Sequence, residues 1–261
     1  MKPLSRRDLL GATSRLTGSI ALGLPLAGAS AASPETAAPS GIHKTKIVVA
    51  GGHPDDPESG CGGTIARYTD LGHEVAIIYL TRGEAGIDGK SHAEAAAIRT
   101  AEALKACEIL KARPIFAGQI DGITEVTPAS YEAFGKILDA EAPDVVYTHW
   151  PVDSHRDHRA TSLLVYDAWI RGGKRFALYY FEVMTGHQTS HFWPTHYVDI
   201  TATEARKRAS YFAHSSQQPD KYYPYHDEMN RYRGMESGRK YAEAYMRHLQ
   251  SPDDSLPGAS Q

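Results

Sequence analysis

Short apolar runs alternate with longer, helix-like segments along most of this chain. Residues 45–50 form a β-branched apolar run, short enough for a strand buried in a parallel sheet. The next segment, residues 57–71, has the length of a helix and is followed by Gly72, a typical helix end. The predicted strands are residues 45–50, 74–80, 114–117, 144–148, 177–183 and 196–200. The predicted helices are residues 57–71, 92–111, 129–140, 158–170, 203–213 and 236–249.

This alternation predicts the α/β fold class, as a Rossmann-like, doubly wound, mostly parallel sheet with helices on both faces in a single domain. In the usual strand order, the first and fourth strands are neighbours where the order reverses. Ligands bind at that point, outside the carboxyl ends of the strands. The loops after Ala50 and Thr148 should therefore face one another across a crevice, and both are rich in His and Asp.

The composition narrows the class of protein. Of the 261 residues, 41% are apolar and 23% are charged. These values are ordinary for a globular chain, and with only two Cys they exclude collagen, a disordered tail and a small disulfide-held domain. The net charge of −3 argues against a nucleic-acid partner, which requires a basic face. No apolar stretch reaches the roughly 18 residues that a membrane helix needs.

The first 32 residues have the features of an export signal. A twin-arginine box, SRRDLL at residues 5–10, precedes a weakly apolar stretch with cleavage options that end at Ala29 or Ala31. We expect residues 1–32 to direct twin-arginine export to the periplasm or the cell exterior, 33–43 to be a linker and 44–261 to be the folded domain. The alternative is a disordered basic N-terminus. In an oxidising compartment Cys61 and Cys107 could pair, although two buried free thiols are favoured because both lie among small residues.

The loop after the first strand, GGHPDDPE at residues 51–58, carries an imidazole and two adjacent carboxylates. Proline favours an extended conformation in the residue before it, so we expect a stiff loop in which Asp56 caps a helix that starts at Pro57. The alternative is structural: Asp56 only caps the helix, and His53 is a polar residue at a strand end. The glycines do not have the GxGxxG spacing of a dinucleotide site.

The loop after the fourth strand, HWPVDSHRDH at residues 149–158, supplies further imidazoles. His155 and His158 are three residues apart where a helix begins, so both can face one side. One of them, placed opposite His53 and Asp56, completes two His and one carboxylate. Catalytic zinc sites have this composition, and ferrous oxygenases use the same ligand types. We interpret Asp153 as a turn residue and His149 as structural or supporting.

These two loops resemble those of the PIG-L/LmbE-like metal-dependent deacetylases, in the motifs G-H-P-D-D and D-x-H-x-D-H. Weaker matches are TRGEAG at residues 81–86, RTAE at 99–102 and HSSQ at 214–217. The resemblance runs from about residue 46 to residue 217. It implies removal of an N-acetyl group from an N-acetylglucosamine-type substrate.

The resemblance also implies roles for single residues. The metal ligands would be His53, Asp56 and His158, which would hold one Zn²⁺ per chain, with Fe²⁺ as the alternative ion. Asp55 would be the general base. His155 would support the oxyanion or protonate the leaving amine.

Two further positions match residues that contact the substrate in the family. Arg99 would contact sugar hydroxyls and Asp121 would do likewise, with a surface salt bridge and a turn residue as the respective alternatives. The sequence departs from the family at Gly52, Pro57 and Arg156, where Ala, Glu and Pro are more common. The shift of the acid from position 57 to Glu58 leaves the role of that acid open, but no predicted ligand is altered.

The substrate is predicted only as a class, an N-acetylated or N-acylated small molecule or oligosaccharide. Ten of the fifteen Tyr lie in residues 179–261, which suits an aromatic rim around a sugar and equally suits ordinary packing. Export favours a cell-wall or extracellular amino sugar. The rival hypotheses are a sugar-binding module without catalysis and a metallophosphoesterase.

Overall fold

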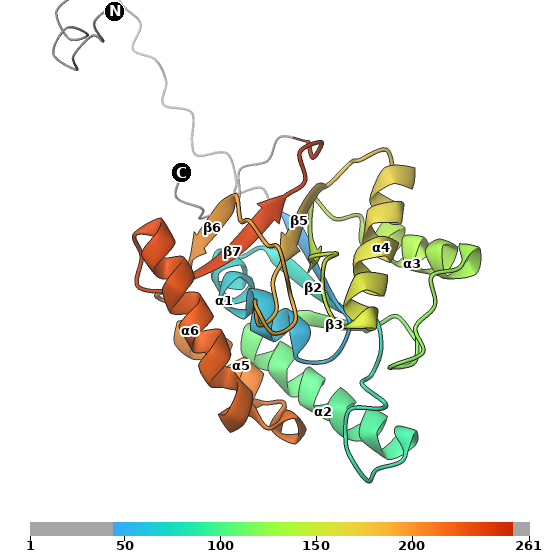
Figure 1. The fold of residues 1–261 in the computed structure, drawn as a ribbon. Coiled ribbons are helices and arrows are strands. Elements are labelled where there is room, and N and C mark those ends of the chain that lie inside the picture. Colours follow the sequence, from blue (N-terminus) through green and yellow to red (C-terminus); the bar gives the residue numbers. More distant parts are fainter. Residues whose placement is uncertain (1–43, 253–261) are drawn as a thin grey trace, which may run out of the picture. The chain divides into compact units, whose positions relative to one another are not determined.

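The computed structural model describes residues 44–252, which build a seven-stranded sheet in the order β3-β2-β1-β4-β5-β7-β6. The strands are β1 (Lys46–Gly51), β2 (Glu74–Tyr79), β3 (Arg113–Phe116), β4 (Val145–His149), β5 (Ala177–Phe181), β6 (His196–Asp199) and β7 (Ala242–Arg247). Neighbours among β1 to β5 pair in parallel, whereas β7 runs antiparallel to β5 and β6. The predicted doubly wound α/β fold is therefore confirmed, with a mixed edge (Figure 1).

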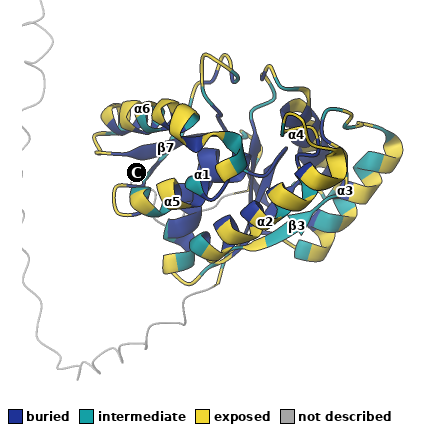
Figure 2. Cartoon of the chain, turned by 90° about the horizontal axis from the view of Figure 1, so that it is seen from below, coloured by how far each residue is buried: buried dark blue, intermediate teal, exposed yellow. Residues whose placement is uncertain are grey.

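Helices cover both faces of this sheet. They are α1 (Asp56–Asp70), α2 (His92–Leu110), α3 (Pro128–Glu141), α4 (Arg156–Arg171), α5 (Glu204–Phe212) and α6 (Pro219–Ser237), with a short 3₁₀ helix at Ser215–Gln217. Alternate residues of β1 point to opposite faces, as a strand dictates. Ile47 and Val49 pack in one core with α1 and α2, and Val48 and Ala50 in the other with α3 and α4. Figure 2 shows the strands as the buried layer and the helices with exposed outer sides.

The glycines of α1 let this helix approach its neighbours closely. A Cβ on Gly60 would lie 2.4 Å from the Phe181 ring of β5, and one on Gly63 would lie 2.6 Å from Ile200.

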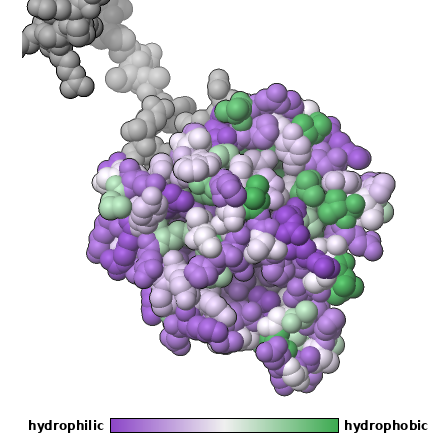
Figure 3. Space-filling model, viewed as in Figure 1, coloured by the Kyte–Doolittle hydropathy of each residue, from purple (hydrophilic) through white to green (hydrophobic). Residues whose placement is uncertain are grey.

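Cys61 is buried beside Gly60 and Cys107 is buried in α2; both are free thiols, as the favoured interpretation predicted. None of the described helices is long and apolar enough to cross a membrane. The surface seen in Figure 3 is mostly hydrophilic, with separate hydrophobic patches.

Most predicted elements agree with the structure within two residues at each end, but the predicted helix at residues 236–249 is wrong. This part of the chain contains the end of α6 and the strand β7, separated by Gly238 with a φ of 69°. Residues such as Ala242, Glu243 and Met246 favour helices intrinsically, yet pairing with two strands outweighs that preference. Helix α6 escaped prediction because it contains Pro224 and Gly234, which normally interrupt helices.

A buried ion pair joins β7 to α5, and its carboxylate also bonds to α1. The Nζ atom of Lys207 lies 2.6 Å from Oε1 of Glu243, and both side chains are almost fully buried. The Glu243 carboxylate also accepts hydrogen bonds from the Gly63 and Thr64 amides of α1. A charge placed inside the fold requires such partners. The strand conformation of Glu243 is thus fixed by contacts with residues far away in the sequence.

The predicted export signal at residues 1–32 and the linker at 33–43 lie outside the described residues, as do residues 253–261.

Candidate active site

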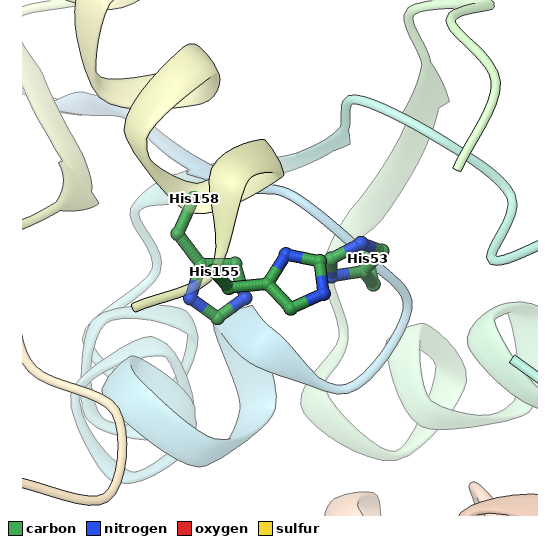
Figure 4. Close-up of side chains that lie close together, drawn as sticks. All are labelled: His53, His155 and His158. Atoms are coloured by element: carbon green, nitrogen blue, oxygen red, sulfur yellow. The ribbon is translucent and has the colours of Figure 1, made fainter. Parts of the chain in front are cut away.

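The two His- and Asp-rich loops meet at the carboxyl ends of the adjacent strands β1 and β4, where the strand order reverses. His53 comes from the loop after β1, and His155 and His158 come from the start of α4; Figure 4 shows their rings converging. A cavity of about 500 Å³ opens over them. The topology thus brings together residues that are about one hundred positions apart in the sequence.

The start of α1 differs by one residue from the expectation. Asp55, and not Asp56, is the N-cap; its φ is 112°, and α1 begins at Asp56. Glu58 completes the cap because its Oε2 accepts the Asp55 amide at 3.2 Å. The Asp56 side chain is consequently free to face the crevice. Glu58 is fully buried and also accepts the Tyr79 hydroxyl at 2.5 Å, which gives this displaced acid a defined structural place.

The Asp56 carboxylate lies between two imidazoles. Its Oδ2 is 3.1 Å from Nδ1 of His53, and its Oδ1 is 3.2 Å from Nε2 of His158. All three side chains are buried. In a tetrahedral zinc site with bonds of about 2.0–2.1 Å, neighbouring ligand atoms are about 3.3 Å apart. The donor types suit a divalent ion. The groups whose ligand atoms all lie within 4.8 Å of one another are His53 with His155 and His158, Asp56 with His149 and His158, and His53 with Asp121 and Asp157.

Further carboxylates hold each ring by its other nitrogen. Nε2 of His53 lies 3.1 Å from Asp157 and 3.2 Å from Asp121, and Nδ1 of His158 lies 3.2 Å from Asp153. A proton on the outer nitrogen leaves the inner lone pair directed at Asp56, the arrangement that metal-ligating histidines usually have. Burial alone would lower the pKa of His53, yet its three carboxylate partners raise it well above the ordinary value. The surroundings thus favour a positive charge here.

His149 lies close to this centre and belongs to one group of potential ligands, with Asp56 and His158. Its Nε2 accepts the Gly52 amide at 3.0 Å, so the lone pair is in use. The ring stacks on His158 with centroids 4.0 Å apart. Burial, together with His158, lowers the pKa of His149 to about 4, and the ring is neutral. Its place agrees with the supporting interpretation.

His155 presents a hydrogen-bond donor to the cavity. Its Nδ1 accepts the Asp157 amide at 3.3 Å, which places the proton of the neutral ring on Nε2. The ring meets His53 edge to face, with centroids 4.6 Å apart, and lines the cavity. Burial and the neighbouring histidines lower the pKa of His155.

Asp55 lines the cavity beside this centre and is held by Arg99. The guanidinium Nη2 is 3.3 Å from Oδ1 of Asp55 and also donates to the Pro54 carbonyl. Burial raises the pKa of Asp55 to about 6, against the attraction of Arg99. Arg99 is only 3% exposed, so the alternative of a surface salt bridge is wrong.

The TRGEAG motif makes room for Arg99. A Cβ on either Gly83 or Gly86 would lie 2.3 Å from the guanidinium. Gly83 also has a φ of 68°, a conformation that favours glycine. Asp121 lines the cavity as well and is buried against His53, with the Ala85 amide donating to it at 3.2 Å. Asp121 is therefore more than a turn residue.

Several residues that hold the site were not predicted in that capacity. Asp157 is fully buried and accepts hydrogen bonds from the Gly122 amide and the Thr124 hydroxyl; burial raises its pKa, but these bonds and His53 lower it overall. Asp153 makes the predicted turn by accepting the His155 amide, yet it also faces His158. Both acids are part of the D-x-H-x-D-H motif, in which Asp153 faces His158 and Asp157 faces His53.

The HSSQ motif frames the other side of the cavity. Ser215 and Ser216 donate to Glu102 of α2, and Gln217 donates to the Gly86 carbonyl. The predicted aromatic rim is present only in part: Tyr222 lines the cavity, whereas Trp193 is 73% exposed and lies outside its lining.

Comparison with known proteins finds a protein family and relatives that this chain matches. Residues 48–169 match the family model described as PIG-L, GlcNAc-PI de-N-acetylase. Over 218 residues the chain is 33% identical to diacetylchitobiose deacetylase of Thermococcus kodakarensis, a match that covers 76% of this chain and 81% of that protein. The region matched by the family model includes the loops of His53 and of His158.

Solved structures share the fold. N,N′-diacetylchitobiose deacetylase from Pyrococcus horikoshii, in complex with an inhibitor, is 24% identical with a TM-score of 0.71, over 80% of this chain and 88% of that chain. GalB, the 4-carboxy-2-hydroxymuconate hydratase of Pseudomonas putida KT2440, is 20% identical with a TM-score of 0.71, over 81% and 99% of the two chains. The second likeness shows that the fold also carries other chemistry, so the reaction has to be argued from the site.

Proposed function

Because the chain belongs to the PIG-L family of de-N-acetylases, we propose that it is a metal-dependent hydrolase that removes an N-acetyl or N-acyl group from an amino-sugar-type substrate. The observation that carries this proposal is the Asp56 carboxylate held between His53 and His158, with Asp55 next to it at the cavity. The diacetylchitobiose deacetylase of Thermococcus kodakarensis supports the choice of an N-acetylated sugar.

The residues that would hold the metal are His53, Asp56 and His158, with one ion per chain. Two neutral imidazoles and one carboxylate suit Zn²⁺, and Fe²⁺ accepts the same ligands. When bound, such an ion supplies Lewis acidity, which activates water and polarises the acyl carbonyl. The described residues contain three groups of potential ligands, and the group of His53, His155 and His158 overlaps each of the other two, so all three lie in one cluster.

Asp55 would accept the proton of the attacking water. It is not among the three ligands, it lines the cavity, and its carboxylate is oriented by Arg99 while Glu58 holds its backbone. A base positioned in this way contributes about 10²–10⁴-fold to the rate.

His155 would act on the opposite side of the reacting amide. Its Nε2–H can donate to the oxyanion that forms when water adds to the acyl carbon. The same proton can pass to the nitrogen as the C–N bond breaks, which yields a carboxylate and a free amine. Asp157 fixes the ring orientation by donating its amide to Nδ1.

The family match suggests that Arg99 and Asp121 are near the sugar. Both line the cavity, but both are already paired with site residues, Arg99 with Asp55 and Asp121 with His53. Their influence on the sugar would therefore be coupled to the positions of the base and of one ligand. Together with the proposed export, these features favour an extracellular or cell-wall amino sugar as the substrate.

The proposal is tested by acetate release from N,N′-diacetylchitobiose, with and without a chelator. We expect release that the chelator abolishes and that added Zn²⁺ or Fe²⁺ restores. Binding of the sugar without release would instead identify a sugar-binding module. Hydrolysis of a phosphate ester with no acetate release would identify a phosphoesterase.

A further inference from the structure

The wall of the cavity built by α5 and α6 carries hydrogen-bonding side chains that the proposed reaction does not use. Tyr211 of α5 and His226 of α6 both line the cavity, although they are only 4% and 2% exposed. Their rings pack with centroids 4.9 Å apart. Both lie beyond residue 169, where the match to the family model ends. This wall thus lies outside the region that the family model matches.

His226 has a buried polar atom with no partner. Its Nδ1 is enclosed and forms no hydrogen bond with any of the described residues. Burial, together with the charge of Lys207, lowers the pKa of His226 to about 3, so the ring is neutral at physiological pH. An unpaired N–H is costly at an enclosed atom, which favours the proton on Nε2. A neutral imidazole of this kind can pair with a hydroxyl or an amide, and it brings no positive charge to balance an anion.

In the described part of the chain, the cavity has no free Lys or Arg for an anionic substrate. Among the described residues that line it, Arg99 is the only Lys or Arg, and it is paired with Asp55. Carboxylates of Asp55, Asp56 and Asp121 line the same space. A phosphate beside α5 and α6 would therefore lie near these carboxylates without a free Lys or Arg to balance its charge.

We propose that Tyr211 and His226 form a subsite for the uncharged, hydroxyl-bearing part of the substrate that extends from the reacting amide toward α5 and α6. This inference rests on the proposed function, because it takes the amide to be held at the centre of His53, Asp56 and His158. Tyr222 lines the cavity too and offers an aromatic face on which a sugar ring can pack. The protein accordingly selects neutral N-acetylated saccharides over phosphorylated ones.

The test measures binding of N,N′-diacetylchitobiose by calorimetry. It uses the Asp55→Asn variant, which should not hydrolyse the sugar during the measurement. Adding Tyr211→Phe or His226→Phe removes one hydrogen-bonding group and keeps an aromatic ring, so we expect Kd to rise about three- to tenfold for each. Tyr223→Phe is the matched control: this side chain is 5% exposed, its hydroxyl bonds Glu204, and it does not line the cavity, so Kd should stay unchanged. With Asp55 intact, the same variants should raise KM much more than they lower kcat.

Equal Kd values for both variants and the control would overturn the inference, as would equally tight binding of N-acetylglucosamine and N-acetylglucosamine 6-phosphate. Thermal unfolding establishes that each variant is folded, and either of the two variants decides the question alone. Absence of acetate release by the unaltered chain would contradict the proposed function. Acetate release with unaffected variants would contradict only the subsite.

Discussion

Carboxylates that stand behind the imidazoles set the directions of the site's donor atoms. Asp157 has hydrogen bonds from a backbone amide and a hydroxyl and lies 3.1 Å from Nε2 of His53. The Asp153 carboxylate lies 3.2 Å from Nδ1 of His158. Each pair turns the remaining nitrogen toward Asp56, so the ligand geometry exists only because the acids behind it are in place.

We therefore expect Asp157→Asn to weaken metal binding about 10–100-fold while the fold is retained, because the amide no longer supplies the charge that orients His53. Metal affinity is measured by competition with a chromophoric chelator. Asp139→Asn is the control, since Asp139 pairs with Arg175 at the surface. Unchanged affinity in Asp157→Asn would show that this acid does not support the site.

At this scale, the sequence predicted that the loop of His53 and Asp56 would meet the loop of His155 and His158, because each loop follows a strand whose place in the sheet was predictable; only the resemblance to the family singled out His158 as the ligand. It did not predict that Asp55 would be the N-cap or that Glu58 would accept its amide. Such details depend on a left-handed backbone conformation and on side-chain packing, which residue types and spacing do not determine.

At the scale of elements, the close packing of helix α1 against its neighbours requires glycine at particular positions. Its apolar contacts are made across Gly60 and Gly63, which lie against Phe181 and Ile200. The sequence places three glycines in this helix, at positions 60, 62 and 63. It could not reveal β7, since Ala242–Arg247 reads as a helix and becomes a strand only between β5 and β6.

Two substitutions of helical glycines should have opposite effects on the free energy of unfolding. Gly60→Ala places a methyl group into the Phe181 ring and should destabilise the fold by about 1–3 kcal/mol. Gly135→Ala in α3 meets nothing within 4 Å and should stabilise the fold by about 0.5–1 kcal/mol, because Ala favours helices. Urea unfolding measures both; a stabilising Gly60→Ala would contradict the close packing of α1 on β5.

At the scale of the whole molecule, the reversal of strand order between β1 and β4 creates the crevice, and the alternation of strands and helices predicted it. The N-terminal segment would serve as the export signal of this domain. We propose export by the twin-arginine route from the box at residues 5–10.

Replacing Arg6 and Arg7 by Lys in the full chain should keep the protein in the cytoplasm, because the export machinery reads the arginine pair and not the charge alone. Cell fractionation with immunodetection measures the distribution, and the unaltered chain serves as the reference. Equal export of both chains would refute the proposed route.

The central claim, that His53, Asp56 and His158 hold one catalytic ion while Asp55 serves as the base, is tested most directly by the metal content per chain. Elemental analysis would compare the unaltered protein with Asp55→Asn and His158→Ala, and acetate release would be followed in parallel. We predict one ion in the unaltered protein and in Asp55→Asn, almost none in His158→Ala, and a loss of turnover of about 10²–10⁴-fold in Asp55→Asn. A full complement of metal in His158→Ala, or an active Asp55→Asn enzyme, would contradict the account.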